Sequence, residues 1–246
     1  MAEEAYLTQT TPDRSDTARV NRTLDKLRGC GLRDFDLTGS LAFETHRLAR
    51  EARAARRTLN DIDIVVADFA TVPQRLTADF LVMHVHPDAH AGKMVVQIVD
   101  PEESLRIDIF SAYGRTRQRS SRVVSPFGEV PVVSIEDLAA RAGSIVFGLA
   151  RGERVARKHA DDFGVLAAWS DPDLVEICWQ DHRRSNDPST FKEASRRIRE
   201  LVLKNDALLV APQYSQDPDA VCPKCRELGR WRRAPGRTIL SILGYV

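Results

Sequence analysis

Three aspartates are the side chains of this sequence best suited to chemistry. Asp61 and Asp63 belong to a short run in which acidic and apolar residues alternate, and Asp108 belongs to a second run of the same kind. Because successive side chains of a strand point to opposite faces, Asp61 and Asp63 share one face while the isoleucines beside them enter the core. Carboxylate oxygens are the ligands that hard cations such as Mg²⁺ prefer, and such cations also bind phosphates. The pattern therefore predicts a site for two divalent ions at these three residues.

A glycine–serine turn precedes the aspartates. The predicted strand 35–37 runs into Gly39 and Ser40, and a helix is expected to follow over residues 41–57. Gly39 lets the backbone come close to a phosphate, and Ser40 offers its hydroxyl and amide at a helix start, where the dipole favours an anion. Acids are common at exposed strand ends, so each piece alone is a weak signal. Gly-Ser after one strand, followed by aspartates on two later strands, is a much stronger signal because order and context agree.

The elements that must position these residues divide the chain into unlike parts. Residues 1–14 are polar and expected to fray, and residues 15–130 alternate strands with helices, which predicts a catalytic domain around a small mixed sheet. After a proline-containing connection around Gly128, predicted helices fill a second domain at 131–210, and a basic, turn-rich tail covers 211–246. Strands are expected at 35–37, 61–66, 80–86, 94–99 and 104–110, and helices at 15–29, 41–57, 71–78, 134–149, 153–169, 173–183 and 188–204. The predicted fold class is α+β, with a small mixed sheet followed by a helical domain.

The composition narrows the class of protein further. With 246 residues and a hydrophobic fraction of 43%, the chain can build a core as one domain or two small ones. It has no apolar run of about eighteen residues, so no membrane span is expected, and its acidic start lacks the apolar core of a secretory signal. Four cysteines are too few and too scattered for a disulfide framework, so the expected location is the cytosol.

In this order, the motifs resemble those of the polymerase-β-like nucleotidyltransferase superfamily over roughly residues 33–112, and the run at 60–66 is similar to its second motif. The resemblance implies transfer of a nucleoside monophosphate from a triphosphate such as ATP to a hydroxyl, with release of pyrophosphate and two Mg²⁺ ions. Asp61 and Asp63 would hold the ion that carries the triphosphate, and Asp108 the ion beside the attacking hydroxyl.

The segment between the turn and the first aspartates departs from that family, because it is longer than in the common form. This difference leaves the subfamily open. The added residues include Arg53, Arg56 and Arg57, which either reach a triphosphate or an RNA, or form a solvated helix face.

A second resemblance lies in the predicted helical domain. Glu136-Asp137-Leu138, followed by Lys158-His-Ala-Asp-Asp162, resembles the helical region of nucleotidyltransferases from bacterial abortive-infection and toxin–antitoxin systems. Lys158 and Asp162 share a helix face, so the resemblance implies that Lys158 contacts the triphosphate and Asp162 orients it. The alternative is an exposed ion pair with little energetic weight. The resemblance also implies an RNA acceptor, such as a tRNA 3′ end, and an antitoxin partner, while small-molecule and protein hydroxyls stay open.

Two weaker patterns remain. His84, His86 and His90 could bind a metal, although a histidine pair at a sheet edge is the simpler interpretation. Cys222 and Cys225 have the spacing of half a zinc site, which would need two further ligands from Cys30, Cys178 or His182; the alternative is a reduced thiol pair. The competing hypotheses of another class are a catalytically silent, antitoxin-like module and a zinc-stabilised RNA-binding protein. The silent module is disfavoured because keeping three mutually repelling carboxylates together costs electrostatic energy.

Overall fold

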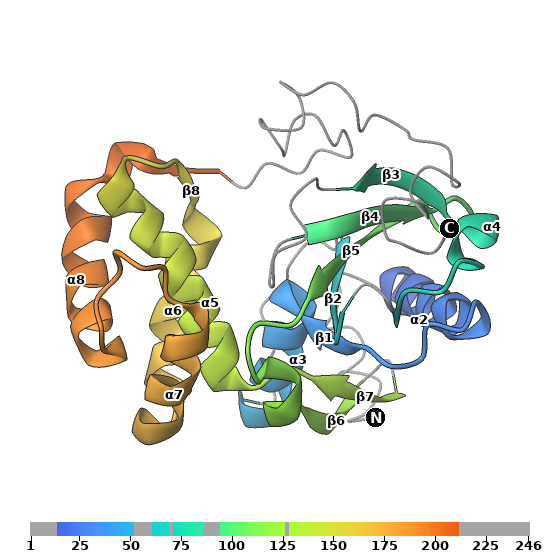
Figure 1. Cartoon of the computed structure of the whole chain (residues 1–246), viewed down its shortest axis with the longest axis horizontal. Helices are drawn as coiled ribbons and strands as arrows, with labels where there is room; N and C mark the ends of the chain where they lie inside the picture. The colour runs from blue at the N-terminus through green and yellow to red at the C-terminus, as the bar shows by residue number, and fades with distance from the viewer. Residues whose placement is uncertain (1–13, 52–60, 69–70, 86–93, 126–127, 212–246) are drawn as a thin grey trace. The chain divides into compact units, whose positions relative to one another are not determined.

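A computed structural model of the chain describes residues 14–51, 61–68, 71–85, 94–125 and 128–211 (Figure 1). The chain forms two compact units. Within the described residues, the first unit contains the chain up to Ala112 together with Ser120–Val132, and the second contains Tyr113–Arg119 and the chain from Val133 onward. The first unit is built on a mixed sheet and the second on helices. The predicted α+β fold class is confirmed.

The first unit is organised by a seven-stranded sheet in the order β3-β4-β5-β2-β1-β7-β6. Two neighbouring pairs, β2 with β5 and β1 with β7, are parallel, and the other four are antiparallel. The strands are β1 (Asp36–Thr38), β2 (Asp61–Val66), β3 (Leu81–Val85), β4 (Met94–Asp100), β5 (Leu105–Ser111), β6 (Ser121–Ser125) and β7 (Gly128–Val132).

The core of this unit follows the alternation that the sequence predicts. Ile62 and Ile64 of β2 are fully buried, as are Ile107 and Ile109 of the adjacent β5. The helices α2 (Arg14–Gly29) and α3 (Gly39–Glu51) contact the sheet, and α4 (Leu76–Asp79) is a single short turn. The β2–β5 pair thus combines a buried apolar face with a second face that carries the aspartates.

The helix α2 is fastened to the end of β4 by polar contacts as well as by its apolar side. Thr23 Oγ1 donates a hydrogen bond of 3.1 Å to Asp100, whose carboxylate also accepts one of 2.9 Å from Lys26 Nζ. The Asp100 side chain is buried, and such a buried carboxylate is stable only when its oxygens are paired.

The connection expected around Gly128 contains two further strands instead. β6 and β7 pair antiparallel from Ser121 with Val132 to Ser125 with Gly128, and β7 joins the sheet beside β1. The expectation was wrong because Pro131 suggested a loop, whereas proline is tolerated in a strand whose amide is not needed by the ladder. The exposed β6 is an edge strand and shows no clear alternation of burial.

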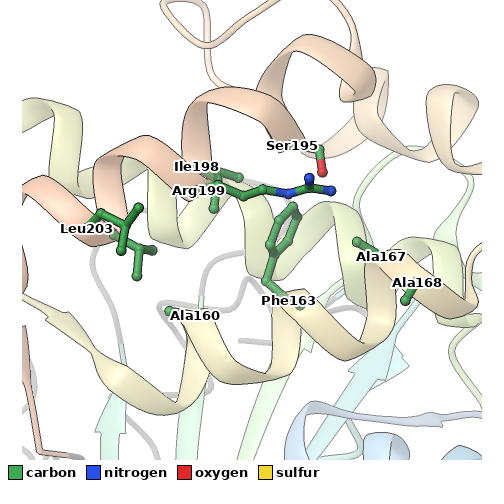
Figure 2. A pocket seen from close by; sticks show the side chains of 10 residues that line it. Ala160, Phe163, Ala167, Ala168, Ser195, Ile198, Arg199 and Leu203 are labelled. Carbon is green, nitrogen blue, oxygen red and sulfur yellow. The ribbon is translucent and has the colours of Figure 1, made fainter.

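The second unit packs four helices and a two-stranded parallel sheet. These elements are α5 (Ile135–Val146), α6 (Arg157–Trp169), α7 (Pro172–His182) and α8 (Phe191–Lys204), with β8 (Val155–Ala156) and β9 (Leu209–Val210). The helix start predicted at Ser134 is confirmed, since its hydroxyl accepts the amide of Asp137 at 3.1 Å. An apolar groove of about 420 Å³ runs between α6 and α8, with Phe163 and Ile198 among its lining residues (Figure 2).

A buried ionic network ties the segment Tyr113–Arg119 to these helices. Asp137 of α5 accepts hydrogen bonds from Arg119 at 2.6 and 2.8 Å and lies 2.9 Å from His182 Nε2. Burial alone would raise the pKa of Asp137, but the bonds from Arg119 and His182 hold it well below its ordinary value. Burial lowers the pKa of His182 and outweighs the opposing effect of Asp137.

Among the described residues, no helix combines the length and the apolarity that crossing a membrane would require.

Candidate active site

The three predicted aspartates come together on one face of the β2–β5 pair. Asp63 and Asp108 are direct neighbours in the parallel register, and Asp61 lies two residues earlier on β2. Each of the three offers a carboxylate oxygen, and these oxygens all lie within 4.8 Å of one another. Asp108 is buried, whereas Asp61 and Asp63 are half-buried. The sheet therefore holds three carboxylates at a separation that a shared cation could bridge.

Gly39 forms one wall of this acidic cluster. β1 runs antiparallel to β2 and ends opposite Asp63, and the chain turns at Gly39 into α3 with φ +64°. A β-carbon at position 39 would lie 1.9 Å from Asp63 Oδ2, so no other residue fits without displacing the carboxylate. From the sequence, Gly39 was expected to let the backbone come close to a phosphate. The structure adds that the first group to come this close is the side chain of Asp63.

Ser40 is the second residue of α3 and is half-buried. The first amides of a helix have no partner within the helix and carry the positive end of its dipole. The helix start beside Asp63 is therefore suited to bind the anionic part of a ligand whose cation is held by the aspartates. Its structure is compatible with the predicted role of Gly39 and Ser40 toward phosphate.

Two neighbours of the cluster were missed from the sequence. Arg106 lies opposite Asp61 on β5; its terminal nitrogen donates to the Asp61 carboxylate, and its Nε lies 3.3 Å from Asp108 Oδ1. Gln97 lies opposite Asp108 on β4 and donates to Asp108 Oδ1 at 3.0 Å. The signal for Arg106 was its position two residues before Asp108, which places both side chains on the same face of the strand.

The donor set fits Mg²⁺. All three candidate ligands of the cluster are carboxylates, with no thiol or imidazole among them, and oxygen-only sets suit hard divalent cations rather than zinc. The guanidinium of Arg106 already lies among these oxygens, which shows that the cluster attracts positive charge.

The other predicted site residues fall elsewhere in the chain. Lys158 and Asp162 lie on α6 in the second unit, with Asp162 buried and Lys158 half-buried, and their action on a nucleotide stays a prediction. Several predicted residues lie outside the described part of the chain, namely Arg53, Arg56, Arg57, His86, His90, Cys222 and Cys225. His84 falls within β3.

Two thiols considered for a zinc site are buried, and their burial disfavours the thiolate. Burial, with a further contribution from Asp79, raises the pKa of the Cys30 thiol to about 11, and its sulfur donates to Asp79 at 2.9 Å. Burial raises the pKa of Cys178 to about 12. Because zinc binds thiolates, neither residue is disposed to supply a ligand in this conformation.

No protein-family model matches the chain, and no curated protein matches it either. Among solved structures, it is similar to the crystal structure of an antigenic nucleotidyltransferase-like protein from Paracoccidioides brasiliensis. The sequence identity is 16%, the match covers 78% of this chain and 89% of that chain, and the TM-score is 0.41. Similarity at this level carries no weight for the reaction, which has to be inferred from the acidic cluster itself.

Proposed function

We propose that the protein is a nucleotidyltransferase that moves a nucleoside monophosphate from a nucleoside triphosphate to an acceptor hydroxyl and releases pyrophosphate. The observation that carries this proposal is the convergence of Asp61, Asp63 and Asp108 within 4.8 Å, beside the glycine that begins α3. The aspartates supply negative charge for the metal ions of a metal–triphosphate complex, and the helix start supplies partial positive charge for its phosphates.

Two Mg²⁺ ions held by Asp61, Asp63 and Asp108 would neutralise the phosphates and ionise the acceptor hydroxyl. Ser40 and the first amides of α3 orient the triphosphate by hydrogen bonds to its oxygens. The acceptor oxygen forms a bond to the α-phosphorus while the bond from that phosphorus to the bridging oxygen breaks, so pyrophosphate leaves. Asp108, held in place by Gln97, receives the hydroxyl proton.

For the acceptor, we propose RNA, with the 3′ end of a tRNA as the first candidate and ATP as the first donor. This choice rests on the resemblance of the helical region to toxin nucleotidyltransferases, in which Lys158 and Asp162 would act on the triphosphate and an antitoxin would be the partner. A hydroxyl of a small molecule or a protein is the alternative acceptor.

The test is incubation of the purified protein with each α-³²P nucleoside triphosphate, Mg²⁺ and total RNA. Label should appear on RNA with the native protein and be lost with Asp63→Asn. Asp68→Asn is the matched control, because Asp68 is an exposed acid of the same unit outside the cluster. Label on protein or on a small molecule would replace the RNA acceptor, and equal labelling by the native protein and Asp63→Asn would refute the assignment of the aspartates.

One observation supports a second function, that of a catalytically silent binding module. Arg106 supplies its own positive charge to Asp61 and Asp108, and a protein that kept this arrangement permanently would need no metal. Titration with Mn²⁺ in the presence of a triphosphate separates the two functions. Stoichiometric Mn²⁺ binding that disappears in Asp63→Asn supports the enzyme, whereas no binding at the cluster supports the silent module.

A further inference from the structure

A polar concavity lies in the first unit, and none of its lining residues belongs to the acidic cluster. It is a groove of about 540 Å³ between the end of α2, the start of β1 and the paired strands β6 and β7. Three arginines line it, Arg28, Arg33 and Arg122, together with a single acidic residue, Glu129. The groove thus carries an excess of positive charge that nothing in the transfer chemistry uses.

The three guanidinium groups are held to different degrees. Arg28 lies 5.9 Å from the ring centroid of Phe35 and donates to Asp25 at 2.8 Å, and the backbone carbonyl of Arg28 accepts a hydrogen bond of 3.4 Å from Arg33 Nε. The side chain of Arg122, exposed on β6, has no hydrogen bond or ion pair with the described residues. The groove therefore combines oriented arginines with one whose donors are available to a ligand.

The ligand that best fits such a groove is one with several phosphates. Arginine presents a planar fork of donors that matches a phosphate, and exposed arginines from separate elements suit a chain of phosphates better than a single ion. β1 connects the groove to the acidic cluster, because the strand follows Phe35 directly and ends at Thr38, next to Gly39. At about 3.3 Å per residue, the four residue steps from Phe35 to Gly39 span about 13 Å.

We propose that this groove binds the phosphodiester backbone of an RNA acceptor, a few nucleotides before the 3′ hydroxyl that lies at the acidic cluster. The naming of RNA as acceptor rests on the proposed function, while the binding of RNA by the groove does not require transfer. An acidic protein segment could also bind these arginines. An RNA acceptor fits better, because it would place its phosphates in the groove and its 3′ hydroxyl at the acidic cluster of the same unit.

The experiment measures binding of the full chain to a fluorescent single-stranded 12-nucleotide RNA in EDTA, where no transfer occurs, over a series of salt concentrations. The double variant Arg33→Ala/Arg122→Ala should weaken binding by about tenfold and reduce the dependence of log K on log salt by about 1.4, because each lost phosphate contact removes about 0.7 for a single strand. Replacement of both arginines by lysine should restore part of the affinity, since the charge returns without the fork.

The matched control is Arg184→Ala/Arg196→Ala, which removes two exposed arginines from the second unit. The control should bind RNA within about twofold of the native protein. Equal losses in both double variants, or no loss in the groove variant, would overturn the proposal. Tighter binding of a polyglutamate peptide than of RNA, lost in the groove variant, would also overturn it in favour of an acidic protein. If transfer to RNA is absent but the groove variant still loses RNA binding, the proposed function is wrong and the proposal that the groove binds RNA is supported.

Discussion

At the scale of single residues, the acidic cluster depends on Gly39, because only a residue without a β-carbon leaves room for the Asp63 carboxylate. Gly39→Ala should displace the Asp63 carboxylate, because a β-carbon there would lie 1.9 Å from it, and should strain a backbone with φ +64°. We expect a loss of about 1–3 kcal/mol in the free energy of unfolding and a loss of Mn²⁺ binding. Both are measured by urea unfolding and by metal titration of the same sample.

Gly152→Ala is the matched control for that substitution. Gly152 has a similar φ of +73°, but no atom lies within 4 Å of the position that its β-carbon would take. It should therefore lose stability by the backbone effect while metal binding stays unchanged. Normal Mn²⁺ affinity in Gly39→Ala would show that Asp63 can rearrange.

A substitution of Arg106 should have the opposite effect on metal binding by the same carboxylates. Arg106→Gln removes a competing cation from Asp61 and Asp108, so Mg²⁺ affinity in the absence of nucleotide should rise about threefold to tenfold. The metal-free protein should melt at a lower temperature, because the carboxylates lose their counter-charge. Calorimetric titration and thermal unfolding in EDTA measure the two effects.

Arg22→Gln serves as the control, since Arg22 pairs with Glu103 in the same unit at an exposed position away from the cluster. It should leave Mg²⁺ affinity unchanged. A weaker affinity in Arg106→Gln than in the native protein would mean that Arg106 positions the aspartates rather than competing with the ion.

At the scale of elements, local patterns determined most of what could be predicted. The alternation of Asp61 to Val66 predicted β2 with its bounds, because one buried and one polar face leave a period of two in the sequence. β7 was missed because Pro131 suggested a loop, and its place beside β1 comes from a parallel pairing across more than ninety residues, with Leu37 opposite Val132. Such long-range pairing leaves no local signal.

The same limit applies to the polar contacts between elements. Asp137 was predicted to lie near the start of a helix, but its partner Arg119 lies on a different element. Arg106 could have been assigned to the face of Asp108 from the strand period, but its bond to Asp61 depends on β2 lying beside β5. Spacing within an element is therefore predictable, whereas partners on other elements require the register of the sheet or the packing of the helices.

The network that joins α5, α7 and Tyr113–Arg119 predicts how stability depends on pH. His182 contacts Asp137, Thr116 and Tyr113, and burial keeps its pKa below the ordinary value of about 6.5. In the unfolded chain the histidine gains a proton below that pH, whereas the buried one gains it only at a lower pH. The free energy of unfolding should therefore fall as the pH drops below about 6.5.

Asp137 adds a second loss at lower pH. Its folded-state pKa is depressed, so its stabilising contribution is present above about pH 4 and is lost as the pH falls further. Urea unfolding between pH 7.5 and 3 measures both phases. His182→Gln should flatten the first phase, and an unchanged pH profile in this variant would contradict the assignment to His182.

At the scale of the whole molecule, the second unit is discontinuous in sequence. Residues 113–119 precede the strands β6 and β7 but pack with the helices. A fragment that begins at residue 133 should therefore be less stable than one that begins at residue 113, by about 3–5 kcal/mol, because Asp137 keeps its buried charge and loses Arg119.

Urea unfolding of the two fragments, followed by the fluorescence of the buried Trp179, measures this difference. Arg119→Ala in the longer fragment should reproduce most of the loss. Equal stability of the two fragments would mean that the helices satisfy Asp137 without the earlier segment.

The bond between Arg106 and Asp61 also affects the order in which a working protein is assembled. A cluster of carboxylates without any cation would have to wait for an ion before its strands could settle together. Here the chain carries its own counter-charge within the sheet, so we expect the strands to pack together without an ion. Preparation in a chelator should therefore yield folded protein that can still be loaded with a divalent ion afterwards.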